Sequence, residues 1–146
     1  MREMYGEILV PTDGSPEIED AIAEALDLAA STGGRIHAVS VVDTREYSTL
    51  SDAKWLTIER DRTERGESAI ADVRKRADER GVPVETELLR GIPHEEILDY
   101  ADENGIEVVV MGTHGRSGVE HFLNGSVTEK VIRNSTLPIL VVRVTA

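Results

Sequence analysis

The sequence predicts an α/β fold: a single open, mostly parallel five-stranded sheet with helices on both faces. The first observation is that strand-like apolar segments alternate with helical repeats along all 146 residues. The second is IEVVVMG at 106–112, whose almost continuous apolar character is typical of a buried parallel strand. The third is the glycine that follows most helical repeats. Since no linker, repeat or low-complexity tract is present, we expect one domain over 1–146.

The first part of the chain is expected to contain two strands separated by a helix. EILVPT at 7–12 is typical of a buried first strand. Ser15-Pro16 then favours a helix start, because serine is a good N-cap and proline suits the first helical position. Apolar residues recur at helical spacing over 18–29, and Gly33-Gly34 ends that helix. RIHAVSVV at 35–42 predicts the second strand.

The middle of the chain is expected to form a long helix and a third strand. From about 50 to 80 the pattern predicts a polar helix that is interrupted by Gly66 and ended by Gly81. VPVETELLR at 82–90 alternates between apolar and polar residues, which predicts a strand. Residues 43–49, between the second strand and this helix, give no clear pattern.

The last part of the chain predicts two further helix and strand pairs. Pro93 favours a helix start, and Asn104-Gly105 closes that helix before the strand at 106–112. A final helix is expected at 126–134, followed by the strand PILVVRV at 138–144. Strands and helices therefore alternate from one end of the chain to the other, which is the pattern of a parallel sheet.

Composition restricts the classes of function. The chain has 16 lysines and arginines against 28 aspartates and glutamates, a formal net charge of −12. This argues against broad nucleic-acid binding and against an anionic membrane surface. Only three of the basic residues are lysines, which suggests adaptation to high salt; an ordinary acidic protein is the other reading. Without a signal core or an apolar run that could span a bilayer, we expect a cytoplasmic protein with no membrane partner.

Two loops have a composition suited to ligand binding. PTDGS at 11–15 follows the first strand, and a glycine-bearing loop at 112–125 follows the fourth. If these strands are neighbours where the strand order reverses, the loops face each other across a crevice. Glycine lets backbone N–H groups approach an anion, and the amides at 125–128 would cradle phosphate at a helix N-terminus. The alternatives are that the glycines only shape a long loop and that Ser126 only caps the helix.

Several polar side chains have both a structural and a functional reading. Asp13 either bonds to nearby amides in a turn or contacts a ribose or Mg²⁺ at the crevice floor. His114 and Arg116 could add hydrogen-bond donors to the second loop. The four histidines have no metal-ligand spacing, and we expect His37 on the strand surface and His94 at a helix start. No dedicated metal site and no nucleophile–base pair is predicted.

Together these motifs resemble a known family. The spacing Gly112-x2-Gly115-x9-Gly125-Ser126, with ILVPTDGS before it and LPILVV after it, is similar to the ATP-binding branch of the universal stress protein family. The resemblance covers essentially the whole chain. It implies a Rossmann-like, adenine-nucleotide alpha hydrolase-like fold with strand order 3-2-1-4-5. It also implies that ATP binds between the first and second loops described above, and that a homodimer forms through the last strand.

The resemblance also assigns roles within the site. It implies that Asp13 contacts the ribose, that the backbone of Val41 contacts adenine, and that residues of the second loop and final helix hold the phosphates. Mg²⁺ or Mn²⁺ would arrive on those phosphates rather than at a site of its own. The residues expected to bind the nucleotide are Pro11, Thr12, Asp13, Val41, Met111, Gly112, His114, Gly115, Arg116, Gly125, Ser126, Val127 and Thr128.

The expected function is that of an ATP-binding, nucleotide-dependent stress-response or signalling module. The alternative is a slow ATP hydrolase or phosphotransferase that uses the same site, with Asp13 positioning metal or water. A third possibility is a flavodoxin-like electron carrier, although the chain has few rings to sandwich a flavin. The strand at 138–144 is apolar on both faces, so an exposed edge there would pair with a second copy.

Overall fold

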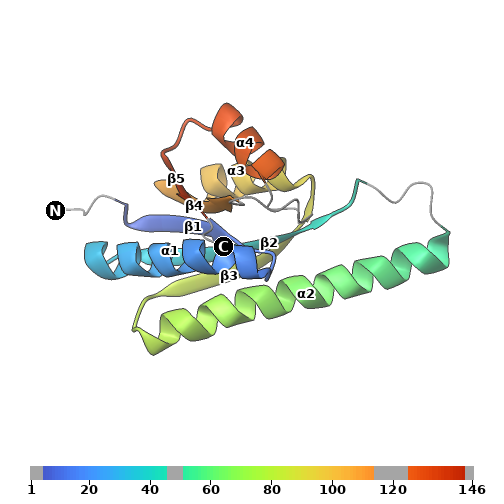
Figure 1. The fold of residues 1–146 in the computed structure, drawn as a ribbon, viewed down its shortest axis with the longest axis horizontal. Coiled ribbons are helices and arrows are strands. Elements are labelled where there is room, and N and C mark those ends of the chain that lie inside the picture. Colours follow the sequence, from blue (N-terminus) through green and yellow to red (C-terminus); the bar gives the residue numbers. More distant parts are fainter. Residues whose placement is uncertain (1–4, 46–50, 114–124, 144–146) are drawn as a thin grey trace.

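The computed structural model describes residues 5–45, 51–113 and 125–143 (Figure 1). Helices and strands alternate through these residues as the sequence predicts. The elements are β1 (Glu7–Pro11), η1 (Pro16–Ile18), α1 (Glu19–Thr32), β2 (Arg35–Asp43), α2 (Asp52–Glu79), β3 (Val84–Gly91), α3 (Pro93–Glu103), β4 (Val108–Thr113), α4 (Gly125–Asn134) and β5 (Ile139–Arg143).

The five strands form one parallel sheet in the order β3-β2-β1-β4-β5. Helices α1 and α2 lie on one face of this sheet, and α3 and α4 lie on the other (Figure 1). This arrangement follows from right-handed crossovers, because the chain moves outward from β1 to β3 and then returns to β4 and β5. The predicted fold class and strand order are therefore confirmed.

The helix boundaries follow mostly from their predicted punctuation. Gly33 adopts a left-handed φ of 69° and ends α1, and Pro93 is the first residue of α3. The region after Ser15 differs from the prediction. Pro16 opens a single 3₁₀ turn, the Ser15 side chain makes no capping hydrogen bond, and the α-helix itself begins at Glu19.

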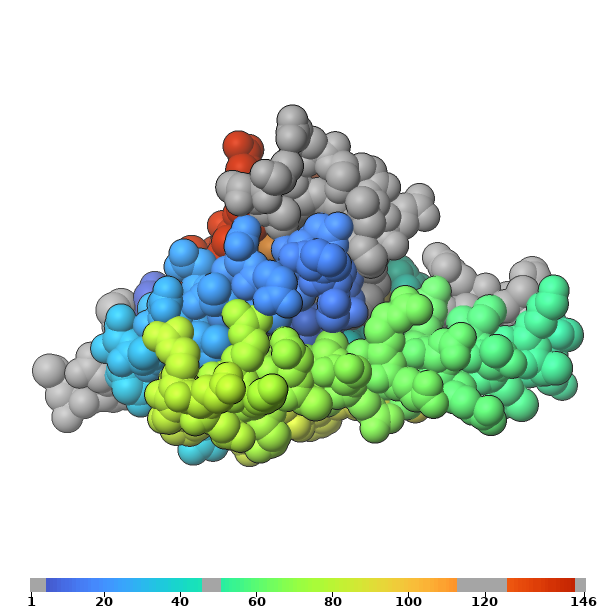
Figure 2. All heavy atoms as spheres, turned by 60° about the horizontal axis from the view of Figure 1, so that its bottom comes forward, coloured from blue at the N-terminus to red at the C-terminus, as the bar shows by residue number. Residues whose placement is uncertain are grey.

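Helix α2 is continuous from Asp52 to Glu79, so the predicted interruption at Gly66 is wrong. Gly66 is buried, and a Cβ atom placed on it would lie 2.7 Å from Leu88 Cδ1 and 3.1 Å from Ser40 Oγ. The residue therefore lets the helix approach β2 and β3 closely rather than breaking it. The N-terminal part of α2 extends well past the sheet, as Figures 1 and 2 show.

The core is filled from both faces of the sheet. The central strands β1, β2 and β4 are buried almost throughout, because helices cover each side. Strand β3 alternates between less and more exposed residues, which fits its position at one edge. No helix in the described ranges is long and apolar enough to cross a membrane.

The prediction that His37 lies on the strand surface is wrong. His37 is 2% exposed and points into the layer between the sheet and α3. Its Nδ1 lies 2.8 Å from the Tyr100 hydroxyl, and its Nε2 lies 2.7 Å from Glu7 Oε1. Burial, together with the charges of Glu87, Glu85 and Glu7, raises the pKa of Tyr100 to about 12. Because helices cover both faces of β2, neither face of this strand is a surface.

Candidate functional site

The strand order reverses between β1 and β4, which is where the sequence predicts a crevice for a ligand. These two strands pair only at Ile8 with Val108 and at Leu9 with Val109. Beyond this point β4 continues to Thr113 alongside β5, whereas β1 ends at Pro11. The carboxyl ends of β1 and β4 therefore separate, and ligands of open α/β sheets bind at such a switch point.

The loop after β1 is held in one conformation by short hydrogen bonds. The Thr12 amide donates to the Val39 carbonyl over 2.8 Å, which extends the β1–β2 pairing by one residue. The Ser15 amide donates to Asp13 Oδ1 over 2.9 Å, and the Gly14 amide donates to Thr12 Oγ1 over 3.1 Å. Asp13 thus has the turn interaction expected of an aspartate here, and its contact with a ligand stays a prediction.

The main-chain N–H and C=O groups of Val41 point toward the side of β2 on which β1 lies. Along β2 the N–H and C=O groups of alternate residues point to opposite neighbours. Arg35 and Val39 bond to the β1 side, through Gly6 and Thr12, whereas Ile36 bonds to Pro83 on the β3 side. The same alternation directs the N–H and C=O of Val41 to the β1 side, where β1 has already ended. Val41 as a whole is 3% exposed, so its side chain belongs to the core, and a contact between its main chain and a ligand stays a prediction.

The end of β2 beyond Val41 is closed by an ion pair. Arg45 donates from Nε to Asp43 Oδ1 over 3.1 Å and from its terminal nitrogen to Oδ2 over 2.7 Å. Burial of Asp43 favours its neutral form. The hydrogen bonds and charge of Arg45, with the charge of Arg62, outweigh that effect and lower the pKa of Asp43. This carboxylate is therefore ionised at neutral pH, and Arg45 is engaged with it.

On the other side of the crevice, β4 leads to the start of α4. A Cβ atom on Gly112 would lie 3.3 Å from the Glu17 carbonyl oxygen and 3.6 Å from Ile18 Cδ1. Glycine at this position therefore allows close packing against η1, and its contact with a ligand stays a prediction. The Thr128 hydroxyl is buried and donates to the Gly112 carbonyl over 3.0 Å, so it ties α4 to β4. Only the Thr128 main chain remains for a phosphate.

The structure brings most of the predicted site residues to one end of the sheet. Met111 and Val127 are buried beside the crevice, and Ser126 is exposed in the first turn of α4. Their positions are set by β4 and α4, and those of Pro11, Thr12, Asp13 and Val41 by β1 and β2. The predictions for His114, Gly115 and Arg116 lie outside the described residues.

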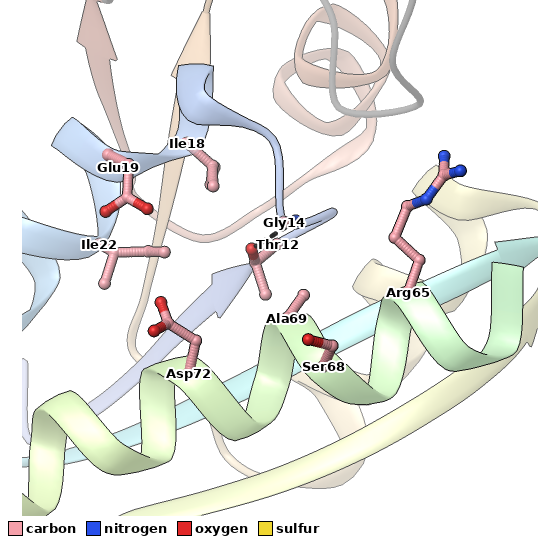
Figure 3. A pocket seen from close by; sticks show the side chains of 9 residues that line it. All are labelled: Thr12, Gly14, Ile18, Glu19, Ile22, Arg65, Ser68, Ala69 and Asp72. Atoms are coloured by element: carbon pink, nitrogen blue, oxygen red, sulfur yellow. Dashed lines mark hydrogen bonds between the residues drawn. The ribbon is translucent and has the colours of Figure 1, made fainter. Parts of the chain in front are cut away.

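A pocket of about 380 Å³ lies against the loop after β1, between α1 and α2 (Figure 3). Thr12 and Gly14 form one wall, and α2 contributes Arg65, Ser68, Ala69 and Asp72. The sequence analysis missed these α2 residues. Their spacing of three and four residues places them on one helical face, which was a signal for this shared position.

Metal ligands do not gather in the part of the chain that the structure describes. No group of three or more histidine, aspartate or glutamate side chains there could hold a metal ion. His94 is the second residue of α3, as expected, and its Nε2 lies 4.0 Å from Glu95 Oε2.

The fold is that of a Rossmann-like α/β protein, a class in which ligands bind at the switch point of the sheet. Comparison with known proteins gives the family. A model of the universal stress protein family matches residues 4–143. The chain therefore belongs to the universal stress protein family, as its glycine spacing and ILVPTDGS predicted.

Individual relatives match along almost their whole length. Universal stress protein MJ0531 of Methanocaldococcus jannaschii is 38% identical over 96% of this chain and 83% of its own. The solved structure of MJ0577 from the same organism is 30% identical, has a TM-score of 0.81 and covers 98% of this chain and 99% of its own.

Two further solved structures are nucleotide complexes. A universal stress protein in complex with cAMP is 25% identical, with a TM-score of 0.62, and covers 97% of this chain and 99% of its own. The universal stress protein of Archaeoglobus fulgidus in complex with dAMP is 26% identical, with a TM-score of 0.62, and covers 94% of this chain and 98% of its own. Both ligands are adenine nucleotides.

Proposed function

We propose that this protein is a nucleotide-binding universal stress protein that holds ATP in the crevice between β1 and β4 and acts as a nucleotide-dependent stress-response or signalling module. The observation that carries the proposal is the direction of the Val41 N–H and C=O groups, which point to the side on which β1 has ended, beside the loop after β1. A purine presents both hydrogen-bond donors and acceptors along one edge, so a paired N–H and C=O suits it. The adenine nucleotides bound by two family members support the same ligand class.

The other parts of the nucleotide have counterparts at the crevice. Asp13, at the end of β1, is the acceptor proposed for the ribose hydroxyls. The first amides of α4, at Gly125, Ser126 and Val127, are at a helix N-terminus, which favours phosphate through its free N–H groups and its dipole. Mg²⁺ or Mn²⁺ would bind through the phosphate oxygens and offset part of their charge.

The experiment that tests this function is the identification of the nucleotide released by heat from the protein purified without added ligand. Chromatography of the extract should show ATP at a substantial fraction of the protein concentration. A predominance of ADP would instead support the slow hydrolase. If the extract is empty, ATP titrated into the same protein should still bind; an empty extract together with no measurable binding would contradict the proposal.

We also propose that the protein is a homodimer through β5. Among the residues that the structure describes, this strand pairs only with β4, so it forms one edge of the sheet. Leu140 and Val141 are each 39% exposed on β5, and Ile132 of α4 is 48% exposed. An apolar edge strand favours pairing with another chain, and a two-fold axis lets the same strand meet itself.

Light scattering tests this assembly. The wild type should have twice the chain mass of 16.0 kDa at micromolar concentration. Val141→Asp should yield monomers, because a carboxylate would be buried without a partner in the interface. Leu56→Asp is the matched control, since Leu56 is 60% exposed on α2 and lies away from β5, and it should leave the dimer intact. A wild type of single-chain mass would exclude the dimer.

A further inference from the structure

Arg65 of α2 lies beside two parts of the proposed nucleotide site. Its neighbour Gly66 packs against Ser40, the residue before Val41 on β2. Its own carbonyl oxygen would lie 3.9 Å from a Cβ atom on Gly14, in the loop after β1. Arg65 therefore leaves α2 at the level at which β1 ends, beside Ser40 and Val41 of β2.

The Arg65 side chain extends away from the acidic end of the pocket. Figure 3 shows it leaving α2 on the far side from Glu19 and Asp72. Those two carboxylates share a different arginine, because Arg76 lies 2.6 Å from Glu19 Oε2 and 3.9 Å from Asp72 Oδ2. The acidic end is thus paired locally, and Arg65 stands apart from it.

Arg65 also differs in its pairing from most of the arginines that the structure describes. It is exposed, and within residues 5–45, 51–113 and 125–143 no carboxylate lies within 4.0 Å of its guanidinium. Six other arginines in those ranges each have a carboxylate partner. They are Arg35, Arg45, Arg76, Arg80, Arg90 and Arg133. In a chain with a net charge of −12, an arginine without such a partner beside the crevice is available to a ligand.

A positively charged side chain near the proposed site would favour the binding of an anionic ligand. A nucleoside triphosphate such as ATP carries a charge of about −4 at neutral pH. A protein with a net charge of −12 repels such a ligand at low salt. Asp13 adds a carboxylate at the crevice, and Arg45 is engaged with Asp43. A nearby guanidinium reduces the repulsion and donates charge-assisted hydrogen bonds to phosphate oxygens.

We infer that Arg65 is a specificity-determining residue that binds the phosphates of the nucleotide, so that this site prefers phosphorylated adenosine to adenosine itself. This inference rests on the proposed function and adds a residue from α2 to a site otherwise built from β1, β2, β4 and α4. Gly14, which lines the same pocket as Arg65, has no side chain that would obstruct a movement of the Arg65 side chain toward the loop after β1.

Calorimetric titration of the full chain with ATP, AMP and adenosine tests the assignment. Arg65→Gln should weaken ATP binding about five- to tenfold at low ionic strength and leave adenosine binding unchanged. The ATP effect should shrink as salt rises, because the contact is exposed and screened. Arg65→Lys should retain most of the affinity, since it keeps the charge. Arg60→Gln is the matched control, because Arg60 is exposed on the same helix, about 7.5 Å nearer its N-terminus. The Arg60→Gln variant should bind all three ligands as the wild type does.

The outcomes separate this inference from the function on which it rests. If the wild type binds ATP and Arg65→Gln binds it as tightly as Arg60→Gln does, Arg65 is not a phosphate ligand and the proposed function stands. If Arg65→Gln weakens adenosine as much as ATP, the guanidinium contacts the base or ribose instead, and the inference is overturned. If the wild type binds none of the three ligands, the proposed function itself fails.

Discussion

Replacement of Gly14 by alanine tests how the loop after β1 is supported. Gly14 has a left-handed φ of 77°, which costs an alanine about 1–2 kcal/mol. The new Cβ atom would also lie 3.2 Å from Ala69 Cβ on α2, so one element must move by a few tenths of an ångström. Overpacking of this kind adds about 1 kcal/mol. We expect Gly14→Ala to lower the free energy of unfolding by about 2–3 kcal/mol.

Gly33→Ala is the matched control for this prediction. Gly33 has a similar φ of 69°, but nothing lies within 4 Å of its added Cβ atom, and it is at the opposite end of α1. It should therefore show the conformational cost alone. In denaturant unfolding, the free energy of unfolding of Gly14→Ala should be about 1 kcal/mol lower than that of Gly33→Ala, because only Gly14→Ala has the close contact with α2.

The same pair of variants should differ in ligand binding. Movement of the loop displaces Thr12 and Asp13, so ATP should bind Gly14→Ala about tenfold more weakly, a loss of about 1.4 kcal/mol. Gly33→Ala should bind ATP as the wild type does. If the two variants are equally stable and Gly14→Ala binds ATP as tightly as the wild type does, the contact with α2 does not hold the loop after β1 in place, and this reasoning is refuted.

Two further predictions concern α2 and the end of β2. Gly66→Ala should destabilise the protein by about 1 kcal/mol despite alanine's better helix propensity, and Leu88→Val should relieve this in a double-mutant cycle; a stabilised Gly66→Ala would contradict the close packing. Arg45→Gln should lower the free energy of unfolding at pH 7 by about 1 kcal/mol. Because Arg45 lowers the pKa of Asp43, that difference should disappear as acid protonates Asp43 below its usual value of 3.8; a difference unchanged between pH 7 and pH 2 would argue against the pair.

Much of the fold was predictable because local signals and packing agree. The continuous apolar run before Gly112 is a central strand covered on both faces, and glycines with positive φ end α1 and precede β3. The order of the strands came from the family resemblance rather than from periodicity. Within the site, the sequence placed Asp13 and Ser126 at opposite sides of one crevice, because parallel strands bring their carboxyl ends together.

The errors arose where tertiary contacts decide what a residue does. Glycine is unfavourable inside a helix, so Gly66 was expected to interrupt α2. Its role is instead decided by its contact with Leu88, which is 22 positions later in the chain. His37 is polar and was therefore expected at the surface, but α3 packs over it and buries it. The position of Arg65 beside Gly14 is likewise decided by the fold, because only the packing of α2 brings it to the loop after β1.

The most direct test of the central claim is to locate ATP on the protein by following backbone amide resonances in a nitrogen-15 titration. We predict that the perturbed amides are those of Asp13, Val41, Gly112 and Ser126, which surround the proposed crevice between β1 and β4. Perturbations confined to Glu19, Ile22 and Asp72, in the pocket between α1 and α2, would place the ligand elsewhere. The absence of any perturbation at millimolar ATP with Mg²⁺ would contradict nucleotide binding by this protein.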